Sequence, residues 1–154
     1  MGTHFKGNPQ ISRALDSYIK LTRASETLAA VLARALARER LTTGQLGVLE
    51  ALLHLGPMNE RELARKLLRS GGNITIVLDN LEGRGMVRRT RSAEDRRYVS
   101  VALTPAGRRF IARVFPAHAE RIAALMSALG ADEQTELGRL CRKLGRAALA
   151  SPGL

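Results

Sequence analysis

The sequence has few aromatic residues, one cysteine and no long hydrophobic run. Aromatic side chains make up 3% of its 154 residues and tryptophan is absent, which disfavours proteins that stack single-stranded nucleic acid on aromatic platforms. The lone Cys141 excludes a disulfide scaffold within the chain. No run of about 18 apolar residues indicates a membrane span, and residues 1–9 lack the apolar stretch of a secretory signal. We therefore expect a cytoplasmic protein.

Positive charge is in clear excess. The chain has 25 lysines and arginines against 14 acidic residues, a formal net charge of +11. An excess of this size indicates nucleic acid or an anionic membrane surface as the partner. Most of the cations are arginines, which bind phosphate and guanine through paired hydrogen bonds. Double-stranded DNA is therefore the partner that we expect, rather than a membrane.

Two short predicted helices joined by a glycine-containing turn occupy the middle of the chain. Asn59 and Glu62 have capping-box spacing and open the first helix, and residues 69–72 interrupt it. Gly85 is placed to end the second helix. The buried stripe of this second helix is expected at Ile74, Val77, Leu78 and Leu81. The pair predicts a helix-turn-helix, whose second helix meets base edges in the major groove.

The other side of the second helix is small and polar near its start, so we assign it to DNA contact. Asn73 and Thr75 have donors and acceptors suited to base edges. Asp79 and Glu82 are interpreted as surface charges that pair with nearby arginines. The residues assigned to DNA contact in this part of the chain are Ser70, Gly72, Asn73, Thr75, Ile76 and Asn80.

A basic hairpin follows directly. Residues 86–91 and 98–103 predict two strands, joined by a polar connection at 92–97. Between Arg84 and Arg97, six arginines oppose two acidic residues, a net of +4. A helix-turn-helix followed by a two-stranded hairpin with a basic tip is a winged helix. Arg97 lies beside the tip, where a planar cation can enter a narrow minor groove, and Asp95 is placed to orient it or to brace the loop through Arg96.

Several short patterns occur together in this region: residues 68–75, 78–82, Gly85, 94–97 and 103–108. In this combination, and over nearly its whole length, the chain resembles the MarR family of transcriptional regulators. The resemblance implies a mainly α fold with a small β-hairpin wing, a winged helix-turn-helix flanked by N- and C-terminal dimerisation helices. It also implies that Arg97 reaches into the minor groove and that Asp95 helps to hold the wing. Gly83 departs from the family pattern, in which a charged or polar residue is more usual.

Long apolar stripes flank the predicted winged helix. We expect a flexible arm at 1–9 and one domain at 10–150, with dimerisation helices at about 10–40 and 105–150 and a DNA-binding part at about 42–103. Thr42 and Gln45 predict another capping box, and Thr104 with Pro105 predicts a helix start. One small winged domain cannot cover these stripes, so we expect a homodimer. Its two-fold axis would set two recognition helices about 34–36 Å apart.

Pro116 and Gly130 interrupt the helical pattern of the C-terminal part of the chain. Pro116 is expected to kink or break the helix that starts at Thr104. Gly130 is expected to end that helix, and Asp132 to cap the last one. Cys141 lies on an apolar helical face, where a buried, unreactive thiol is the usual state.

Patterns that carry catalysis or bind metals do not occur. His4, His54 and His118 lack metal-ligand spacing, and there is no phosphate-binding loop or nucleophile elbow. We therefore expect neither enzyme activity nor a metal or cofactor. The resemblance does imply a small aromatic ligand between the dimerisation helices and the winged domain. The polar residues that could line its cavity are Tyr18, Arg23, His54 and His118, each of which is otherwise a core-edge residue or a surface charge.

Taken together, the sequence predicts a dimeric, sequence-specific regulator of transcription. The resemblance implies a repressor that binds a palindromic operator and is released by a small ligand, phenolic or quinone-like. A non-specific architectural DNA-binding protein is one alternative, which the charge alone would allow. A regulator that senses oxidants through Cys141 is another.

Overall fold

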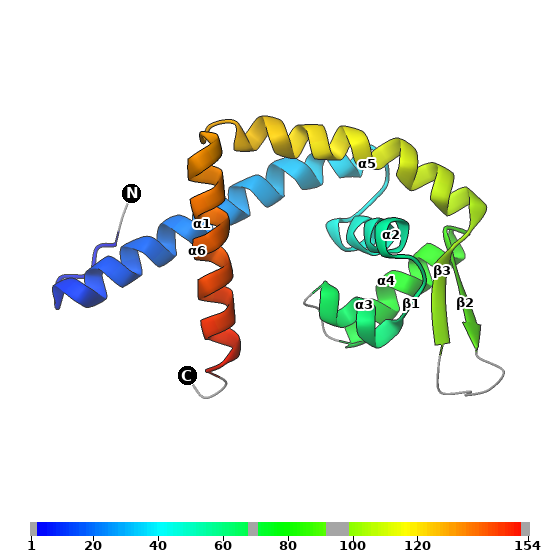
Figure 1. Ribbon diagram of the computed structural model, residues 1–154, viewed down its shortest axis with the longest axis horizontal. Helices are drawn as coiled ribbons and strands as arrows, with labels where there is room; N and C mark the ends of the chain where they lie inside the picture. Colours follow the sequence, from blue (N-terminus) through cyan, green and yellow to red (C-terminus); the bar gives the residue numbers. More distant parts are fainter. Residues whose placement is uncertain (1–2, 68–70, 92–98, 152–154) are drawn as a thin grey trace. The chain divides into compact units, whose positions relative to one another are not determined.

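The computed structural model describes residues 3–67, 71–91 and 99–151, which are mostly helical with a small antiparallel sheet (Figure 1). The predicted fold class is therefore confirmed. By Cα distances the chain divides into two compact units, Met1–His118 and Ala119–Leu154. None of the helices in the described ranges combines the length and apolar character needed to cross a bilayer. In chain order the elements are α1 (Pro9–Ala37), α2 (Thr43–Leu55), β1 (Met58–Asn59), α3 (Glu60–Lys66), α4 (Gly71–Gly83), β2 (Val87–Arg91), β3 (Val99–Leu103), α5 (Pro105–Met126) and α6 (Ala131–Leu149).

The first helices begin where the sequence predicts. Both predicted capping boxes are present, one between Thr42 and Gln45 and one between Asn59 and Glu62. In the second, the Asn59 Oδ1 accepts from the Glu62 backbone N–H at 2.9 Å, and a Glu62 carboxylate oxygen accepts from the Asn59 backbone N–H at 2.9 Å. Two otherwise unsatisfied donors are thereby paired at the start of α3. Helix α1 begins at Pro9, one residue earlier than expected.

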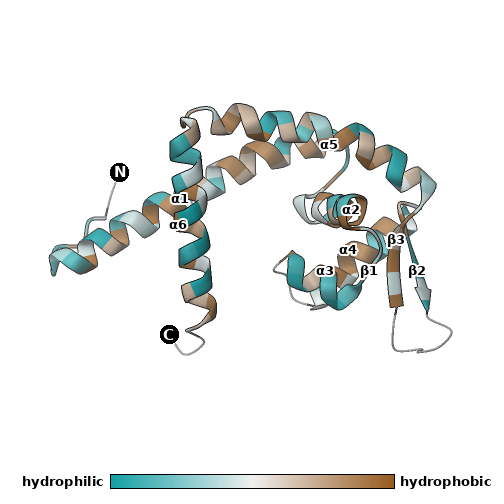
Figure 2. Cartoon of the chain, viewed as in Figure 1, coloured by the Kyte–Doolittle hydropathy of each residue, from teal (hydrophilic) through white to brown (hydrophobic). Residues whose placement is uncertain are grey.

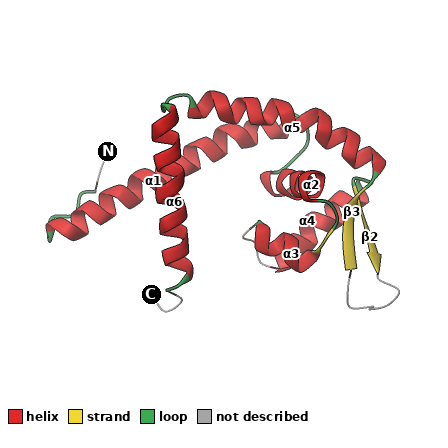
Figure 3. Cartoon of the chain, viewed as in Figure 1, coloured by secondary structure: helices red, strands yellow, loops and turns green. Residues whose placement is uncertain are grey.

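The sheet has one strand more than predicted. Strands β2 and β3 form the expected hairpin, with Val87 opposite Leu103, and β1 pairs antiparallel with the other edge of β3 (Figure 3). The strand at Met58–Asn59 was not predicted. The chain is extended between Gly56 and the N-cap Asn59, so its backbone groups can pair with the free edge of β3. A strand of two residues is too short to show the alternation of apolar and polar residues by which strands are predicted.

The hydrophobic core of the first unit lies among α2, α3, α4, the sheet and the start of α5. Figure 2 shows hydrophobic residues concentrated on α2, α4 and β3. The predicted stripe of α4 is confirmed, because Ile74, Leu78 and Leu81 are fully buried and Val77 packs against them. The largest fully buried side chains are Leu36, Leu49, Leu52, Leu63, Ile74, Leu78, Leu81 and Ile111. This core fixes which side of α4 faces outward.

Helix α4 ends in a Schellman motif. Its last helical residue is Gly83, and Gly85 has a left-handed backbone with φ of +65°. The Met86 N–H donates to the Leu81 carbonyl at 2.9 Å and the Gly85 N–H to the Glu82 carbonyl at 2.8 Å. The expectation that Gly85 terminates this helix is confirmed. The turn leads directly from α4 into β2.

Helix α5 is fastened to that turn. The Thr104 backbone N–H donates to the Met86 carbonyl at 3.0 Å, and its hydroxyl donates to the Gly85 carbonyl at 2.6 Å while accepting from the Gly107 N–H at 3.0 Å. A β-carbon at position 107 would overlap the Met86 carbonyl oxygen, so this close approach requires glycine. Of the kink or break predicted at Pro116, the break does not occur, because the helix runs through the proline without interruption. Val114 and His118 are buried on either side of the proline and hold both turns in the helix.

The second unit contains the end of α5 and all of α6. Gly130, rather than Asp132, is the N-cap of α6, and its N–H donates to the Glu133 carboxylate at 2.8 Å. The predicted cap was therefore wrong, because a side chain reaching back from the first turn serves the purpose instead. No residue of α6 is buried, and hydrophilic and hydrophobic residues share this helix in Figure 2. In the single chain Cys141 is exposed. The expectation of a buried thiol was therefore wrong for the single chain.

Candidate nucleic-acid interface

One side of α4 is buried, and its other side carries the residues predicted to contact DNA. The burial of Ile74, Leu78 and Leu81 turns the intervening positions toward solvent. All predicted contact residues that the structure describes on this helix are exposed: Gly72, Asn73, Thr75, Ile76 and Asn80. The remaining predictions, Ser70, Asp95, Arg96 and Arg97, lie outside the described residues.

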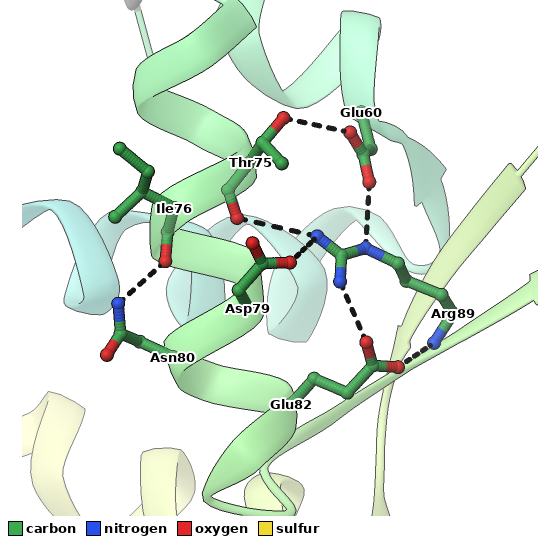
Figure 4. A network of polar contacts seen from close by, with 7 residues as sticks. All are labelled: Glu60, Thr75, Ile76, Asp79, Asn80, Glu82 and Arg89. Carbon is green, nitrogen blue, oxygen red and sulfur yellow. Dashed lines mark hydrogen bonds and ion pairs between the residues drawn. The ribbon is translucent and has the colours of Figure 1, made fainter.

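A guanidinium group joins α3, α4 and β2 at one edge of this exposed side. Arg89 of β2 contacts three carboxylates: its Nε lies 2.8 Å from Glu60, its Nη2 lies 2.7 Å from Asp79, and its Nη1 lies 2.7 Å from Glu82 (Figure 4). The Arg89 backbone N–H also donates to Glu82 at 2.9 Å, and Nη2 donates to the Thr75 carbonyl at 3.4 Å. We call Arg89 with Glu60, Asp79 and Glu82 the Arg89 network.

The charges of the Arg89 network stabilise one another. Hydrogen bonds from the backbone N–H and then the side chain of Arg89 lower the pKa of Glu82 below its usual value. Burial acts to lower the pKa of Arg89, but hydrogen bonds to Asp79 and Glu82 and the charge of Glu60 outweigh it, and the net shift is upward. Glu82 and Arg89 therefore stay charged at neutral pH. Arg89 neutralises carboxylates that would otherwise repel DNA phosphates.

This geometry changes the predicted charge of the hairpin. The net of +4 counted Arg89 as a cation available to DNA, whereas its side chain is only 20% exposed and surrounded by carboxylates. Arg88 and Arg91 on the same strand are exposed, and so are Arg61, Arg65 and Lys66 on α3. These cations lie on elements next to α4, where lysine and arginine contact phosphates and fix the register of a protein on a duplex.

The predicted pairing of Asp79 and Glu82 with arginines is confirmed. Arg89 was not predicted to be the partner, nor Glu60 to be a third carboxylate. The alternation of inward and outward side chains along the strand is the feature of the sequence that could have identified Arg89. Val87 of β2 is buried, Arg88 is exposed, and Arg89 is again half-buried on the side of Val87. An arginine on the inward side of a strand needs a partner, because a buried charge is costly without one.

Two of the predicted base-reading side chains also make contacts within the protein. The Thr75 hydroxyl lies 3.4 Å from a Glu60 carboxylate oxygen, and the Asn80 Nδ2 donates to the Ile76 carbonyl at 2.8 Å (Figure 4). Thr75 therefore faces the Arg89 network, whereas Ile76 and Asn80 lie on the other side of α4 in this view. Part of the hydrogen-bonding capacity of Thr75 and Asn80 is already used in the free protein.

The residues predicted to line a ligand cavity are distributed over three helices. His54 at the end of α2 contacts Phe115 of α5 edge to face, with ring centroids 5.0 Å apart. His118 lies one helical turn beyond Phe115 and is buried. Tyr18 and Arg23 are exposed on α1. The structure thus brings the two histidines to one region around Phe115, and a cavity shared by all four residues stays a prediction.

Comparisons with known proteins agree with this description. The sequence model described as MarR family matches residues 41–99. The chain is 32% identical to the uncharacterised HTH-type transcriptional regulator YkoM of Bacillus subtilis, over 88% of each chain, and 37% identical to the transcriptional repressor MprA of Escherichia coli, over 54% of this chain and 47% of that protein.

Solved structures of similar fold cover most of the chain. AbsC from Streptomyces coelicolor, a MarR family transcriptional regulator, has a TM-score of 0.84 at 19% identity, with 95% of this chain and 99% of that chain covered. A mutant MarR of Escherichia coli complexed with operator DNA has a TM-score of 0.78 at 23% identity (89% and 99% covered). BpsR of Bordetella bronchiseptica, whose DNA binding is regulated by 6-hydroxynicotinic acid, has a TM-score of 0.77 at 24% identity (84% and 98% covered).

Proposed function

Since the chain belongs to the MarR family of transcriptional regulators, we propose that it is a dimeric repressor that binds a palindromic operator in double-stranded DNA. A small aromatic ligand, phenolic or quinone-like, releases it. The DNA-binding part is residues 42–103, and α1, α5 and α6 form the dimer. As a regulator that acts on DNA, it works in the cytoplasm.

The exposed side of α4 is the observation that carries this proposal. It presents Asn73, Ile76 and Asn80 outward, and exposed cations lie on α3 and β2, the elements that pack next to α4. Polar and apolar groups in the middle suit base edges, and cations around them suit phosphates. An architectural DNA-binding protein needs the positive charge but does not need a helix surface that contacts base edges.

The dimer is supported by two helices that bury very few of their residues within the chain. Helix α1 spans 29 residues and buries only Leu36, and α6 spans 19 residues and buries none. The apolar stripe of α6 includes Leu137, Leu140 and Leu144, all exposed. Leu137 and Leu140, together with Leu129 and the acidic residues Asp132, Glu133 and Glu136, line a hollow of about 480 Å³ whose surface is mostly apolar. A second copy of the chain, packed on these helices, would remove this surface from water.

The repressor and ligand parts of the proposal are supported by relatives and by the aromatic contact at the end of α2. MprA is named a repressor, and BpsR responds to an aromatic acid. In this chain, His54 and Phe115 meet edge to face, and the buried His118 lies on the next turn. These rings connect the start of the winged part to α5, so a ligand bound among them would act on both.

The experiment is a footprint on the DNA upstream of the gene for this protein, repeated with candidate phenols and quinones. The affinity for the protected sequence should exceed that for random duplex by at least about 10³-fold, and an active ligand should abolish protection. Asn73→Ala should lose about 1–3 kcal/mol and relax the preference at one position of each half-site. Equal affinity for protected and random duplexes would instead indicate an architectural protein.

A further inference from the structure

Ile76 is a large apolar side chain in the middle of an otherwise polar surface. It is 61% exposed, and among the described residues of the DNA-binding part the other exposed large hydrophobic residue is Leu55, at the end of α2. Around Ile76 on the outward side of α4 are Gly72, Asn73 and Asn80. No burial in the free chain accounts for an isoleucine at this place.

The surrounding contacts hold Ile76 in its outward direction. Thr75 faces the Arg89 network, to which Asp79 belongs (Figure 4). The network fixes that edge of α4 to α3 and β2. Asn80 turns its amide back onto the Ile76 carbonyl at 2.8 Å. Ile74 and Leu78 anchor the opposite side of the helix in the core. The isoleucine methyl groups therefore project from a helix that is fixed on two sides.

The major groove of DNA presents one apolar group, the C5 methyl of thymine, and apolar side chains contact it. We propose that Ile76 reads a thymine methyl in each half-site of the operator. The proposal rests on the DNA binding proposed above and adds a specific requirement to it. The exposed side chain of Ile76 gains apolar contact only when the base at that position is thymine, whose C5 methyl group covers it. Cytosine has no methyl group at C5.

The test uses deoxyuridine, which pairs like thymidine but lacks the C5 methyl. A duplex is first selected from a random library with the full-length protein, and each symmetric pair of thymidines is then replaced by deoxyuridine. The wild-type protein should lose about fourfold in affinity per half-site at one such pair, the value of one methyl group removed from an apolar contact. Ile76→Ala should bind the unmodified duplex more weakly and lose nothing further at that pair.

Matched variants separate this contact from a general effect of exposed apolar groups. Ile76→Val retains branched methyl groups and should keep most of the sensitivity to deoxyuridine. Leu55→Ala removes a similarly exposed side chain from α2 and should leave the sensitivity unchanged. Because Ile76 is exposed, Ile76→Ala should unfold at the same temperature as the wild-type protein.

Two results would overturn the proposal. One is a wild-type protein that selects a specific duplex but tolerates deoxyuridine at every position, and the other is an Ile76→Ala variant that keeps the wild-type sensitivity. In both cases sequence-specific binding itself would stand. Failure of the library to yield any preferred sequence would overturn the proposed function as well, so the two failures are distinguishable.

Discussion

Arg89 is the residue on which the geometry of the reading surface depends most. It neutralises carboxylates from α3 and α4, and its removal leaves Glu60, Asp79 and Glu82 close together without a cation. Arg89→Gln should destabilise the fold by about 1–3 kcal/mol, less than for a fully buried pair because water screens these half-exposed groups. The midpoint of urea unfolding measures the change.

Arg88→Gln is the matched control, since it removes an exposed arginine from the neighbouring position of the same strand and should change the midpoint little. Arg89→Lys keeps the charge but cannot contact three carboxylates with a planar fork, so it should fall between the wild type and Arg89→Gln. A wild-type midpoint for Arg89→Gln would show that the network contributes nothing to stability.

Glu82 gives the same network a pH dependence. Its pKa in the folded protein is lowered, chiefly by the backbone N–H and then by the side chain of Arg89, from an ordinary value of 4.5. Its contribution to stability is therefore present above pH 4.5 and is lost as the pH falls through the lower folded value. In urea unfolding between about pH 6 and pH 3, the free energy of unfolding should fall more steeply for the wild type than for Glu82→Gln. Parallel curves would contradict the assigned role of Glu82.

At the scale of elements, the start of α5 packs closely against the turn before β2. This contact explains why residues 103–107 have the pattern Leu-Thr-x-x-Gly, because Thr104 hydrogen-bonds to the turn and Gly107 lies against it. Gly107→Ala would place a methyl group against the Met86 carbonyl and force α5 away from the turn, at a cost of about 1–3 kcal/mol. Gly83→Ala is the control, because a β-carbon there meets nothing within 4 Å and alanine is the better helix former. Thermal unfolding should show a loss for the first variant only, and equal midpoints would mean that α5 is not tightly held.

At the scale of the whole molecule, the proposed dimer depends on the apolar stripe of α6. Replacing Leu140 and Leu144 together by Asp would place charges in the proposed interface, where each costs several kcal/mol, so dimerisation should weaken by at least about 100-fold. Operator affinity should fall with it, because two linked half-sites become one. Sedimentation velocity gives the first result and a binding titration the second.

Arg146→Gln, on the side of α6 opposite the stripe, is the control and should leave the dimer intact. A doubly substituted protein that still sediments as a dimer would place the subunit contact elsewhere in the chain. A wild-type protein that sediments as a monomer and binds its operator tightly would remove the need for the dimer altogether.

The local structure was readable from the sequence alone. Capping boxes at Thr42 and Asn59, the buried stripe of α4 and the left-handed Gly85 depend on residues within one or two turns of each other. Their hydrogen bonds and their 3.6-residue period follow from the chain itself. The exposure of Asn73, Thr75, Ile76 and Asn80 follows from that stripe, because a helix that buries one side presents the other.

Other features were decided only when distant segments met. Arg89 contacts Glu60 across 29 positions of the sequence, and no local pattern indicates which arginine of a basic hairpin faces inward and becomes unavailable to DNA. Strand β1 needs the free edge of β3. The helix continues through Pro116 because Val114 and His118 are buried on both sides of it. In each case packing or pairing between elements outweighs the local preference, and those free energies depend on the fold rather than on the neighbours in sequence.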